Sequence, residues 1–577
     1  YQGKPLVFVG TVGLIPKKSS AIKKARAGDY IVVIGGRVGQ DGIHGATFSS
    51  EALTSGSPAG AVQIGDPITQ KKLSDAIVKE ARDLKLYHSI TDNGAGGLSC
   101  SVAEMAKESN GCLVQLEKVP LKYPGLEPWK VWISESQERM TLAVPKNTWL
   151  QFSRLMTSRD VEATIIGQFT QSGRCIVKYR DKTIMDIDME FLHNGLPVRP
   201  MKTTPVKSIG KEPEISQRQD FNKTLLSMMQ GLNISSFEFI SKQYDHEVQG
   251  NSVIKPLQGK GRVNGETTVI KPVFDSTHAV ALSQGLYPRY SDIDCYHMAG
   301  ASIDTAIRNV VAAGADPDAI ALLDNFCWCS SRDPQRLYQL KKAAQACYDF
   351  AKVYQAPFIS GKDSMFNDFK GYDKKGNPVK ISIPPTLLIS SIGIIHDVLK
   401  TISIDVKFPG DLVYILGVTN NELGGSEYYA MHSSIGNTVP KIHAVEFMRR
   451  YRVFYQAINK KLITSAISLT RGGLGVALTK AALAGRLGLE VSLHGLPGQV
   501  HRNDFALFSE SQGRLLVTVD PTHKKIFEET MRGTQIKHIG LVTNNQQIII
   551  KGFDNKTIVC VDLNQLNRAY TTVFKDY

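Results

Sequence analysis

The sequence predicts an α/β (α+β) fold in which one type of domain occurs twice. Segments from the two ends of the chain are similar and follow the same order, about 380 residues apart. Each copy contains a strand, a glycine-rich loop and amphipathic helices that alternate with further strands. The chain has 577 residues, enough for about three to five domains, and its 42% hydrophobic and 21% charged residues are typical of a globular protein.

Five short similarities define the repeat. They pair 5–13 with 385–393, 28–35 with 410–417, 96–98 with 472–474, 134–139 with 509–514, and 165–167 with 538–540. The offset drifts only slightly, as insertions in loops would cause. The expected strands are Leu6–Ile15, Ile31–Ile34 and Val413–Leu416, and the expected amphipathic helices are about 71–86 and 474–486.

The two copies are separated by a polar linker at 200–219, a predicted helix pair at about 224–244, and a distinct segment at about 260–384. That segment contains two further predicted helices, 301–313 and 335–354. The second copy thus follows a companion domain, whereas the first copy follows almost nothing. We expect that an equivalent domain once preceded Tyr1; a naturally asymmetric protein is the alternative.

The net charge of +14 favours anionic partners. The basic residues are dispersed and no recognition motif accompanies them, so small anions are expected rather than nucleic acid. No apolar run reaches the ~18 residues of a membrane span, so no membrane partner is expected. The eight cysteines lack the paired spacing of a zinc site, and a reducing cytoplasm is the simplest compartment.

Two glycine-rich turns are candidates for chemistry. Five glycines between Gly35 and Gly45 follow a strand, where either phosphate binding or ordinary turns explain them. Asp92 precedes Gly94, Gly96 and Gly97 at the point where a strand ends and a helix begins. A carboxylate there can hold a metal beside bound phosphates, or it can cap the helix.

The repeat helps to separate these roles. The turn glycines keep their partners in the second copy, but Asp92 is replaced by Ser468, so the carboxylate is expected to serve one site only. The tetrad Ser134–Gln137, expected on a strand, is present in both copies, and a shared structural role competes equally with ligand contact. In the middle segment, Asp324 and the turn 360–364 follow strands, where α/β sheets bind ligands.

Six long motifs occur in order along the chain. They are 39–50, 133–140, 243–250, 292–298, 323–328 and 359–365. Together they resemble phosphoribosylformylglycinamidine synthase, the ligase of purine biosynthesis, and the resemblance covers essentially the whole chain. It implies tandem aminoimidazole-ribonucleotide-synthetase-like units, each an A domain followed by a B domain. The implied division is B1 at 1–200, a linker with short helices at 201–259, A2 at 260–400 and B2 at 401–577, with the first A domain (A1) missing.

The implied reaction uses ATP to activate the formamide oxygen of formylglycinamide ribonucleotide as an iminophosphate, which ammonia then converts to the amidine. Mg²⁺ would neutralise phosphate charge. Ammonia would come from a glutaminase, a partner subunit or fused domain, because no Cys lies in a Gly-x-Cys-x-Gly turn. The alternatives are another ATP-dependent enzyme of the same superfamily or a non-catalytic nucleotide-binding scaffold.

The resemblance also implies roles for individual residues. Lys362 stands where some smaller members have a metal-binding Asn, and the family's catalytic His has no counterpart here, so this chain alone is expected to be inactive. The implied ligands are Gln63, Glu135, Ser136, Gln137 and Ser364 for substrate, Asp324 and Gly361 for nucleotide, and Asp92 for Mg²⁺.

The second copy is expected to bind Mg-nucleotide poorly. Some larger members hold a structural nucleotide there with an Asp in the glycine turn and a Glu and an Asn on an A2 helix. Here those positions are Ser468, Thr305 and Asn309. Arg308 and Arg471 would then be free to retain a bare phosphate by ion pairing.

Overall fold

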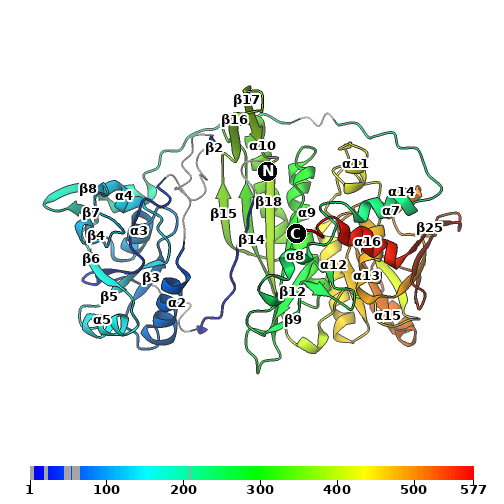
Figure 1. Cartoon of the computed structure of the whole chain (residues 1–577), viewed down its shortest axis with the longest axis horizontal. Coiled ribbons are helices and arrows are strands. Elements are labelled where there is room, and N and C mark those ends of the chain that lie inside the picture. The colour runs from blue at the N-terminus through cyan, green and yellow to red at the C-terminus, as the bar shows by residue number, and fades with distance from the viewer. Residues whose placement is uncertain (1–5, 18–23, 44–52, 55–64, 207–209) are drawn as a thin grey trace. The chain divides into compact units, whose positions relative to one another are not determined.

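The computed structural model describes residues 6–17, 24–43, 53–54, 65–206 and 210–577 (Figure 1). They form two compact units. Unit 1 comprises 1–201 with 366–381, and unit 2 comprises 202–365 with 382–577.

Unit 1 is built on a seven-stranded sheet with the order β3-β5-β1-β6-β4-β7-β8. Neighbouring strands are antiparallel except for the parallel pair β4–β7. The strands in this order are Ser89–Asp92, Arg139–Val144, Tyr30–Gly35, Ala163–Phe169, Cys112–Gln115, Arg174–Tyr179 and Lys182–Asp188.

Helices cover both faces of this sheet because its central strand is apolar on both sides. Ile31 and Val33 of β1 pack into one core, whereas Val32 and Ile34 pack into another. Helix α3 (Leu98–Ser109) and the short α4 (Pro128–Ile133) cover the first face. Helix α2 (Pro67–Asp75), its continuation as the π-helical turn Ala76–Ala81, and α5 (Trp149–Ser158) cover the second.

Unit 2 contains the same sheet again, in the order β20-β22-β19-β23-β21-β24-β25, which matches the first sheet position by position. The single parallel pair recurs as β21–β24. A register shift in the central strand recurs too, between Ile31 and Val32 in β1 and between Val413 and Tyr414 in β19. The predicted repeat is thereby confirmed. The strands in this order are Ser465–Ser468, Leu515–Val519, Leu412–Leu416, Ile536–Thr543, Gly488–Ser492, Gln547–Lys551 and Thr557–Asp562.

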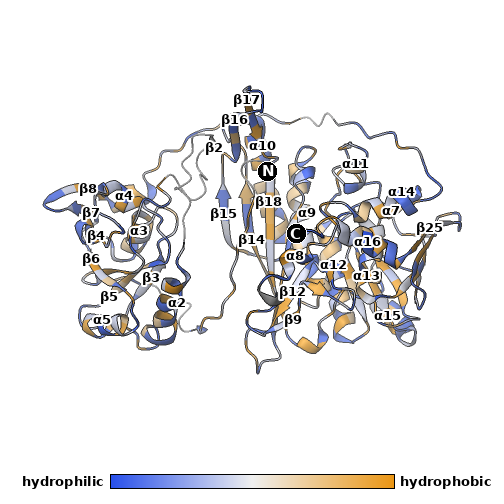
Figure 2. Cartoon of the chain, in the orientation of Figure 1, coloured by the Kyte–Doolittle hydropathy of each residue, from blue (hydrophilic) through white to orange (hydrophobic). Residues whose placement is uncertain are grey.

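The other sheet of unit 2 belongs to the middle segment and has the order β15-β14-β18-β13-β12-β9. Apolar residues run along β18, whereas the end of the edge strand β15 is hydrophilic (Figure 2). Helices α9 (Cys295–Ala312) and α10 (Pro334–Tyr354) are the two predicted helices, each begun by an aspartate N-cap. The strands in this order are Phe358–Ser364, Ile320–Cys327, Thr386–Ile395, Ala279–Leu286, Thr267–Ile270 and Ser252–Ile254.

One hydrophobic core joins this middle segment to the second copy. It contains Ile303 and Ile307 of α9, Phe350 of α10, Phe447 of α12 (Ala444–Asn459) and Tyr414 of β19. The opposite face of the second-copy sheet is covered by a separate core. The helices of that core are α7 (Asn222–Met229), α11 (Glu427–Met431), α13 (Gly473–Gly485), α14 (Asn503–Phe508) and α16 (Leu563–Thr572).

Two local predictions are wrong. The apolar run Leu6–Ile15 is no strand and is largely exposed, with Val9 82% accessible. Its counterpart in β18 is held by pairing with β13 and β14, and no strand among the described residues pairs with this run. Helix α13 is not amphipathic, because all of its residues are buried between neighbouring helices and the sheet. Among the described residues, no helix is both long and apolar enough to traverse a bilayer.

Candidate active site

The glycine turn of the first copy lies where the sequence predicted it, between β3 and α3. Asp92 is the last residue of β3 and is exposed, and its Oδ1 accepts a hydrogen bond from the Gly94 amide at 2.8 Å. The N-cap of α3 is Gly97, so the capping role considered for Asp92 is wrong. Gly97 has φ of 55°, and a Cβ there would lie 1.9 Å from the Ser134 carbonyl oxygen, which explains why only glycine fits.

The tetrad Ser134–Gln137 forms the loop between α4 and β5, not a strand as expected. Its side chains hold the surrounding loops. Glu135 Oε1 accepts a hydrogen bond from the Gly96 amide at 3.0 Å, and the Ser134 hydroxyl donates to the Gly39 carbonyl at 2.7 Å. The polar side chains are therefore satisfied by the glycine-rich loop and the glycine turn that flank them.

The second copy repeats these contacts. Glu510 accepts from the Gly472 amide at 2.9 Å, and Ser509 donates to the Asn420 carbonyl at 2.7 Å. The structural role of the tetrad is therefore confirmed and accounts for its presence in both copies. The substrate contacts implied for Glu135, Ser136 and Gln137 stay predictions.

Sequence reasoning missed a carboxylate that anchors the glycine-rich loop. The Ser136 hydroxyl donates to Asp41, and Ser511 donates likewise to Glu422 in the second copy. Burial raises the pKa of Asp41, but hydrogen bonds from Lys122 and Ser136 outweigh burial and hold this pKa below its usual value. The signal was present in the sequence, because a carboxylate follows the repeated strand in both copies, six residues after Gly35 and five residues after Gly417.

The described part of the glycine-rich loop is largely committed to internal bonds. The Gly36 amide donates to the Glu138 carbonyl at 2.9 Å and the Gly39 amide to the Ser136 hydroxyl at 2.8 Å. These two amides therefore do not support the phosphate-binding interpretation of the loop. Residues 44–52 of the loop and the predicted ligand Gln63 lie outside the described residues.

A cavity of about 410 Å³ opens in unit 1 beside this loop, at the carboxyl end of β1. Its size suits a small metabolite. Gly36 and Gln137 line it together with Arg37, Lys72 and Lys122. Each of these cations pairs with a carboxylate: Arg37 with Glu162, Lys72 with Asp160, and Lys122 with Asp41.

Carboxylates also gather around the glycine turn. Burial raises the pKa of the Cys100 thiol, and the charges of Glu104, Glu135 and Asp92 raise it further. The described residues nevertheless contain no group of three His, Cys, Asp or Glu side chains arranged to hold a metal ion.

In unit 2 the structure brings two predicted nucleotide ligands together. Asp324 of β14 and Gly361 of β15 are paired residues of parallel strands, and a Cβ on Gly361 would lie 2.3 Å from Asp324 Oδ1. Burial and the charge of Asp363 raise the pKa of the Asp324 carboxyl. Ser364 lies three residues further along β15, opposite Cys327.

The repeated sheet and glycine turn define the class of protein. Models of the AIR synthase related proteins match the chain three times, with the C-terminal domain at 26–180 and 409–552 and the N-terminal domain at 265–383. The chain is therefore an AIR synthase related protein with two C-terminal domains.

The relatives narrow this class. Phosphoribosylformylglycinamidine synthase subunit PurL of Thermococcus sibiricus is 31% identical over 581 residues, which cover 98% of this chain and 76% of the relative. The same subunit of Methanococcus aeolicus is also 31% identical, over 100% of this chain and 77% of the relative. The chain belongs to the PurL family of phosphoribosylformylglycinamidine synthase subunits. The companion domain expected ahead of Tyr1 stays a prediction.

Solved structures agree on the fold. Thermotoga maritima PurL complexed with FGAR is 23% identical, with a TM-score of 0.61 over 90% of this chain and 73% of that chain. The same protein complexed with ATP is 21% identical with a TM-score of 0.59, over 90% of this chain and 72% of that chain.

Proposed function

We propose that the protein containing this chain converts formylglycinamide ribonucleotide to formylglycinamidine ribonucleotide in purine biosynthesis, at the expense of ATP. The observation that carries the proposal is the 31% identity to PurL subunits across 98% of the chain. The complexes of T. maritima PurL with FGAR and with ATP support both substrates. Phosphoryl transfer of this kind needs positioning and neutralisation of charge more than covalent participation by the protein.

The second copy supplies a geometric argument for the site in the first. Ser468 and Gln512 hydrogen-bond the same guanidinium, that of Arg308, at 2.6 and 3.0 Å. These two residues occupy the positions of Asp92 and Gln137 in the repeat. Because the two sheets and turns match, Asp92 and Gln137 would lie within reach of one ligand in the first copy.

Asp92 would hold Mg²⁺ in this site, and the ion would neutralise phosphate charge when bound. The carboxylate is exposed at the end of its strand, and Mg²⁺ is commonly bound by one or two carboxylates plus substrate phosphates. Glu135 fixes the turn beside it through the Gly96 amide. The chain's own contribution is therefore a rigid turn that presents one carboxylate.

The remaining assignments follow the same proposal. Asp324 and Gly361 would contact nucleotide, Ser364, Ser136 and Gln63 would contact substrate, and a glutaminase subunit or fused domain would supply ammonia in the cytoplasm. We assign residues 1–200 to B1, 201–259 to the linker, 260–400 to A2 and 401–577 to B2. The domain models matched at 26–180, 265–383 and 409–552 lie inside the B1, A2 and B2 ranges.

Because the chain alone is expected to be inactive, the test uses the purified protein that contains this chain. Release of ADP is measured with formylglycinamide ribonucleotide, ammonium and Mg-ATP, and the amidine product is identified by mass. We expect ADP release to require both substrate and ammonium. Nucleotide binding without turnover would favour a scaffold. Formation of aminoimidazole ribonucleotide from the amidine would identify a different enzyme of the class.

A further inference from the structure

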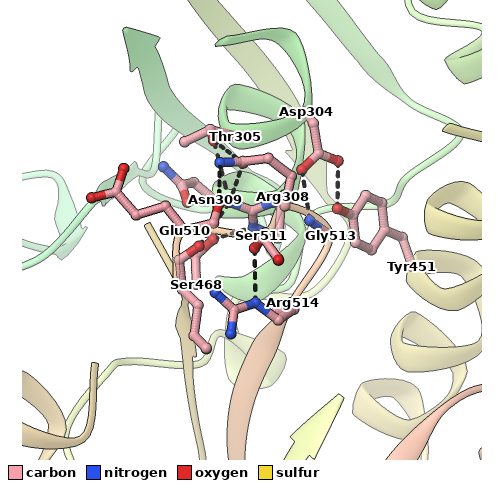
Figure 3. Close-up of polar contacts among 12 residues, drawn as sticks. Asp304, Thr305, Arg308, Asn309, Tyr451, Ser468, Glu510, Ser511, Gly513 and Arg514 are labelled. Carbon is pink, nitrogen blue, oxygen red and sulfur yellow. Dashed lines mark hydrogen bonds and ion pairs between the residues drawn. The ribbon is translucent and has the colours of Figure 1, made fainter. Parts of the chain in front are cut away.

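The turn of the second copy that corresponds to the Asp92 turn is filled from within the protein (Figure 3). The guanidinium of Arg308 donates from Nε to Ser468 Oγ at 2.6 Å, and from Nη2 to the Leu469 carbonyl and to Gln512 Oε1, each at 3.0 Å. Ser468, Leu469 and Gln512 occupy the positions of Asp92, Asn93 and Gln137. A cationic side chain thus lies where the first copy presents a carboxylate.

The positive charge of Arg308 is balanced by a neighbouring carboxylate, that of Asp304. Asp304 lies one turn earlier on α9 and forms an ion pair with Arg308 Nη1, and both side chains are completely buried. Burial lowers the pKa of the Arg308 guanidinium, but Asp304 together with the neighbouring Tyr451 and Tyr287 outweighs burial, and the pKa ends above its usual value. The guanidinium therefore stays charged without any external anion.

Asp304 is satisfied in turn by three other elements. Its Oδ1 accepts from the hydroxyls of Tyr354 on α10 and Tyr451 on α12, at 2.8 and 2.6 Å. Its Oδ2 also accepts from the Gly513 amide at 3.0 Å. The network joins the helices of the middle segment to the tetrad loop of the second copy.

Little space remains beside the network. A cavity of about 20 Å³ is lined by Asn309 and Ser468 among others, and Asn309 Oδ1 is a buried acceptor without a protein partner. Such a volume holds one water molecule, whereas ligand pockets measure hundreds of Å³. The phosphate binding considered for Arg308 and Arg471 also has little support. All three Arg308 nitrogens are engaged, and Arg471 donates to the Leu286 carbonyl at 2.5 Å.

We propose that Arg308 is the built-in ligand of the second-copy site, so that this site takes neither nucleotide nor Mg²⁺ and instead fastens A2 to B2. The ion pair between Arg308 and Asp304 supplies a positive and a negative charge within the protein, in place of the charges of a bound Mg²⁺ and a nucleotide phosphate. The proposal does not depend on the reaction proposed above, because it concerns the copy without the carboxylate.

A chemical-rescue experiment tests the internal ligand. Arg308→Ala leaves Asp304 buried without its cation, so we expect Tm to fall by about 10 °C. Millimolar guanidinium ion should restore part of that loss by entering the vacated space. Ile307→Ala is the matched control, because it removes a buried apolar side chain from the same helix and should lose stability without responding to guanidinium. No fall in Tm for Arg308→Ala, or an equal response of the two variants, would overturn the proposal.

Two further measurements keep the test decisive if Arg308→Ala does not fold. Arg308→Lys keeps a charge near Asp304 but makes fewer hydrogen bonds, so it should fold with an intermediate Tm; a Tm equal to that of the unaltered protein would count against the proposal. Unaltered protein is also photolabelled with Mg-8-azido-ATP and mapped by peptide. Peptides 465–480 and 504–514 should carry no label, and labelling of either that ATP suppresses would overturn the proposal.

Discussion

The two copies of the B-type domain share their architecture and differ in their charges. Their strand orders match, their central strands shift register at the same place, and a glutamate of the tetrad binds the glycine turn in each. The first copy has Asp92 at the end of β3 and Glu104 on α3, whereas the second has Ser468 at the end of β20 and Lys480 on α13. Lys480 is buried and pairs with Glu266 at 2.8 Å.

This difference separates what the fold requires from what a ligand requires. Glycines and hydrogen-bonding loop residues persist in both copies because the backbone cannot close without them. The carboxylate of Asp92 has no counterpart in the second copy, where the charges of Arg308 and Lys480 are balanced by Asp304 and Glu266. Four predictions test this division.

The largest effect is expected at the turn glycines, and it should be equal in both copies. Gly97→Ala and Gly473→Ala each add a Cβ at positive φ, 1.9 Å and 2.3 Å from a tetrad carbonyl oxygen. Strain and overpacking together should cost about 4 kcal/mol of unfolding free energy. Denaturant unfolding measures both, and a variant with unchanged stability would show that its turn can rearrange.

The next largest effect should differ between the two copies. Asp92→Asn removes a charge but keeps the acceptor for the Gly94 amide, so turnover should fall about 100-fold or more while Tm hardly changes. The matched control, Ser468→Ala, should leave turnover near normal. A large loss of stability in Asp92→Asn with normal turnover per folded molecule would instead assign Asp92 a structural role.

Substitutions of the tetrad glutamates should show a smaller difference between the two copies. Glu135→Gln keeps an oxygen acceptor for the Gly96 amide, so stability should hold while turnover falls about 10-fold from the lost charge. Burial raises the pKa of the Glu510 carboxyl, so Glu510→Gln should be tolerated in both stability and turnover. Equal kinetic effects of the two variants would contradict a ligand role specific to Glu135.

The smallest effect concerns acid stability. The pKa of Asp41 is held below its usual value, so its stabilising contribution is present above about pH 4 and is lost as the pH falls through the lowered pKa. Asp41→Asn should cost about 1 kcal/mol at neutral pH and nothing additional in acid. Thermal unfolding between pH 3 and 7 measures the difference, and parallel curves for the two proteins would exclude this contribution.

The sequence predicted the repeated sheet well because the similarities fall on its central strand and turns. Ile31–Ile34 and Val413–Leu416 lie within β1 and β19, and these strands are apolar on both faces, which local pattern reveals. The prediction of a strand at Leu6–Ile15 failed, because a strand also needs neighbouring strands to pair with, and the local sequence pattern does not show whether they are present.

The site was predicted unevenly for a related reason. The place of Asp92 at a strand end follows from order along the chain, and the structure bears it out. The pairing of Arg308 with Ser468 does not follow, because it joins residues 160 positions apart on different elements. The sequence alone suggested that Arg308 could bind a phosphate. The structure shows instead that Arg308 is buried and already forms an ion pair with Asp304.

The hydrophobic core that runs from α9 and α10 into α12 and β19 has a consequence for how the chain can be divided. Family models place a domain boundary between residues 383 and 409, yet a cut there would expose apolar surface on both products. Calorimetry should therefore record a single heat-absorption peak for A2 and B2 together. The segment matched as the N-terminal domain and the C-terminal domain that follows it would then be two stretches of sequence that unfold as one cooperative unit.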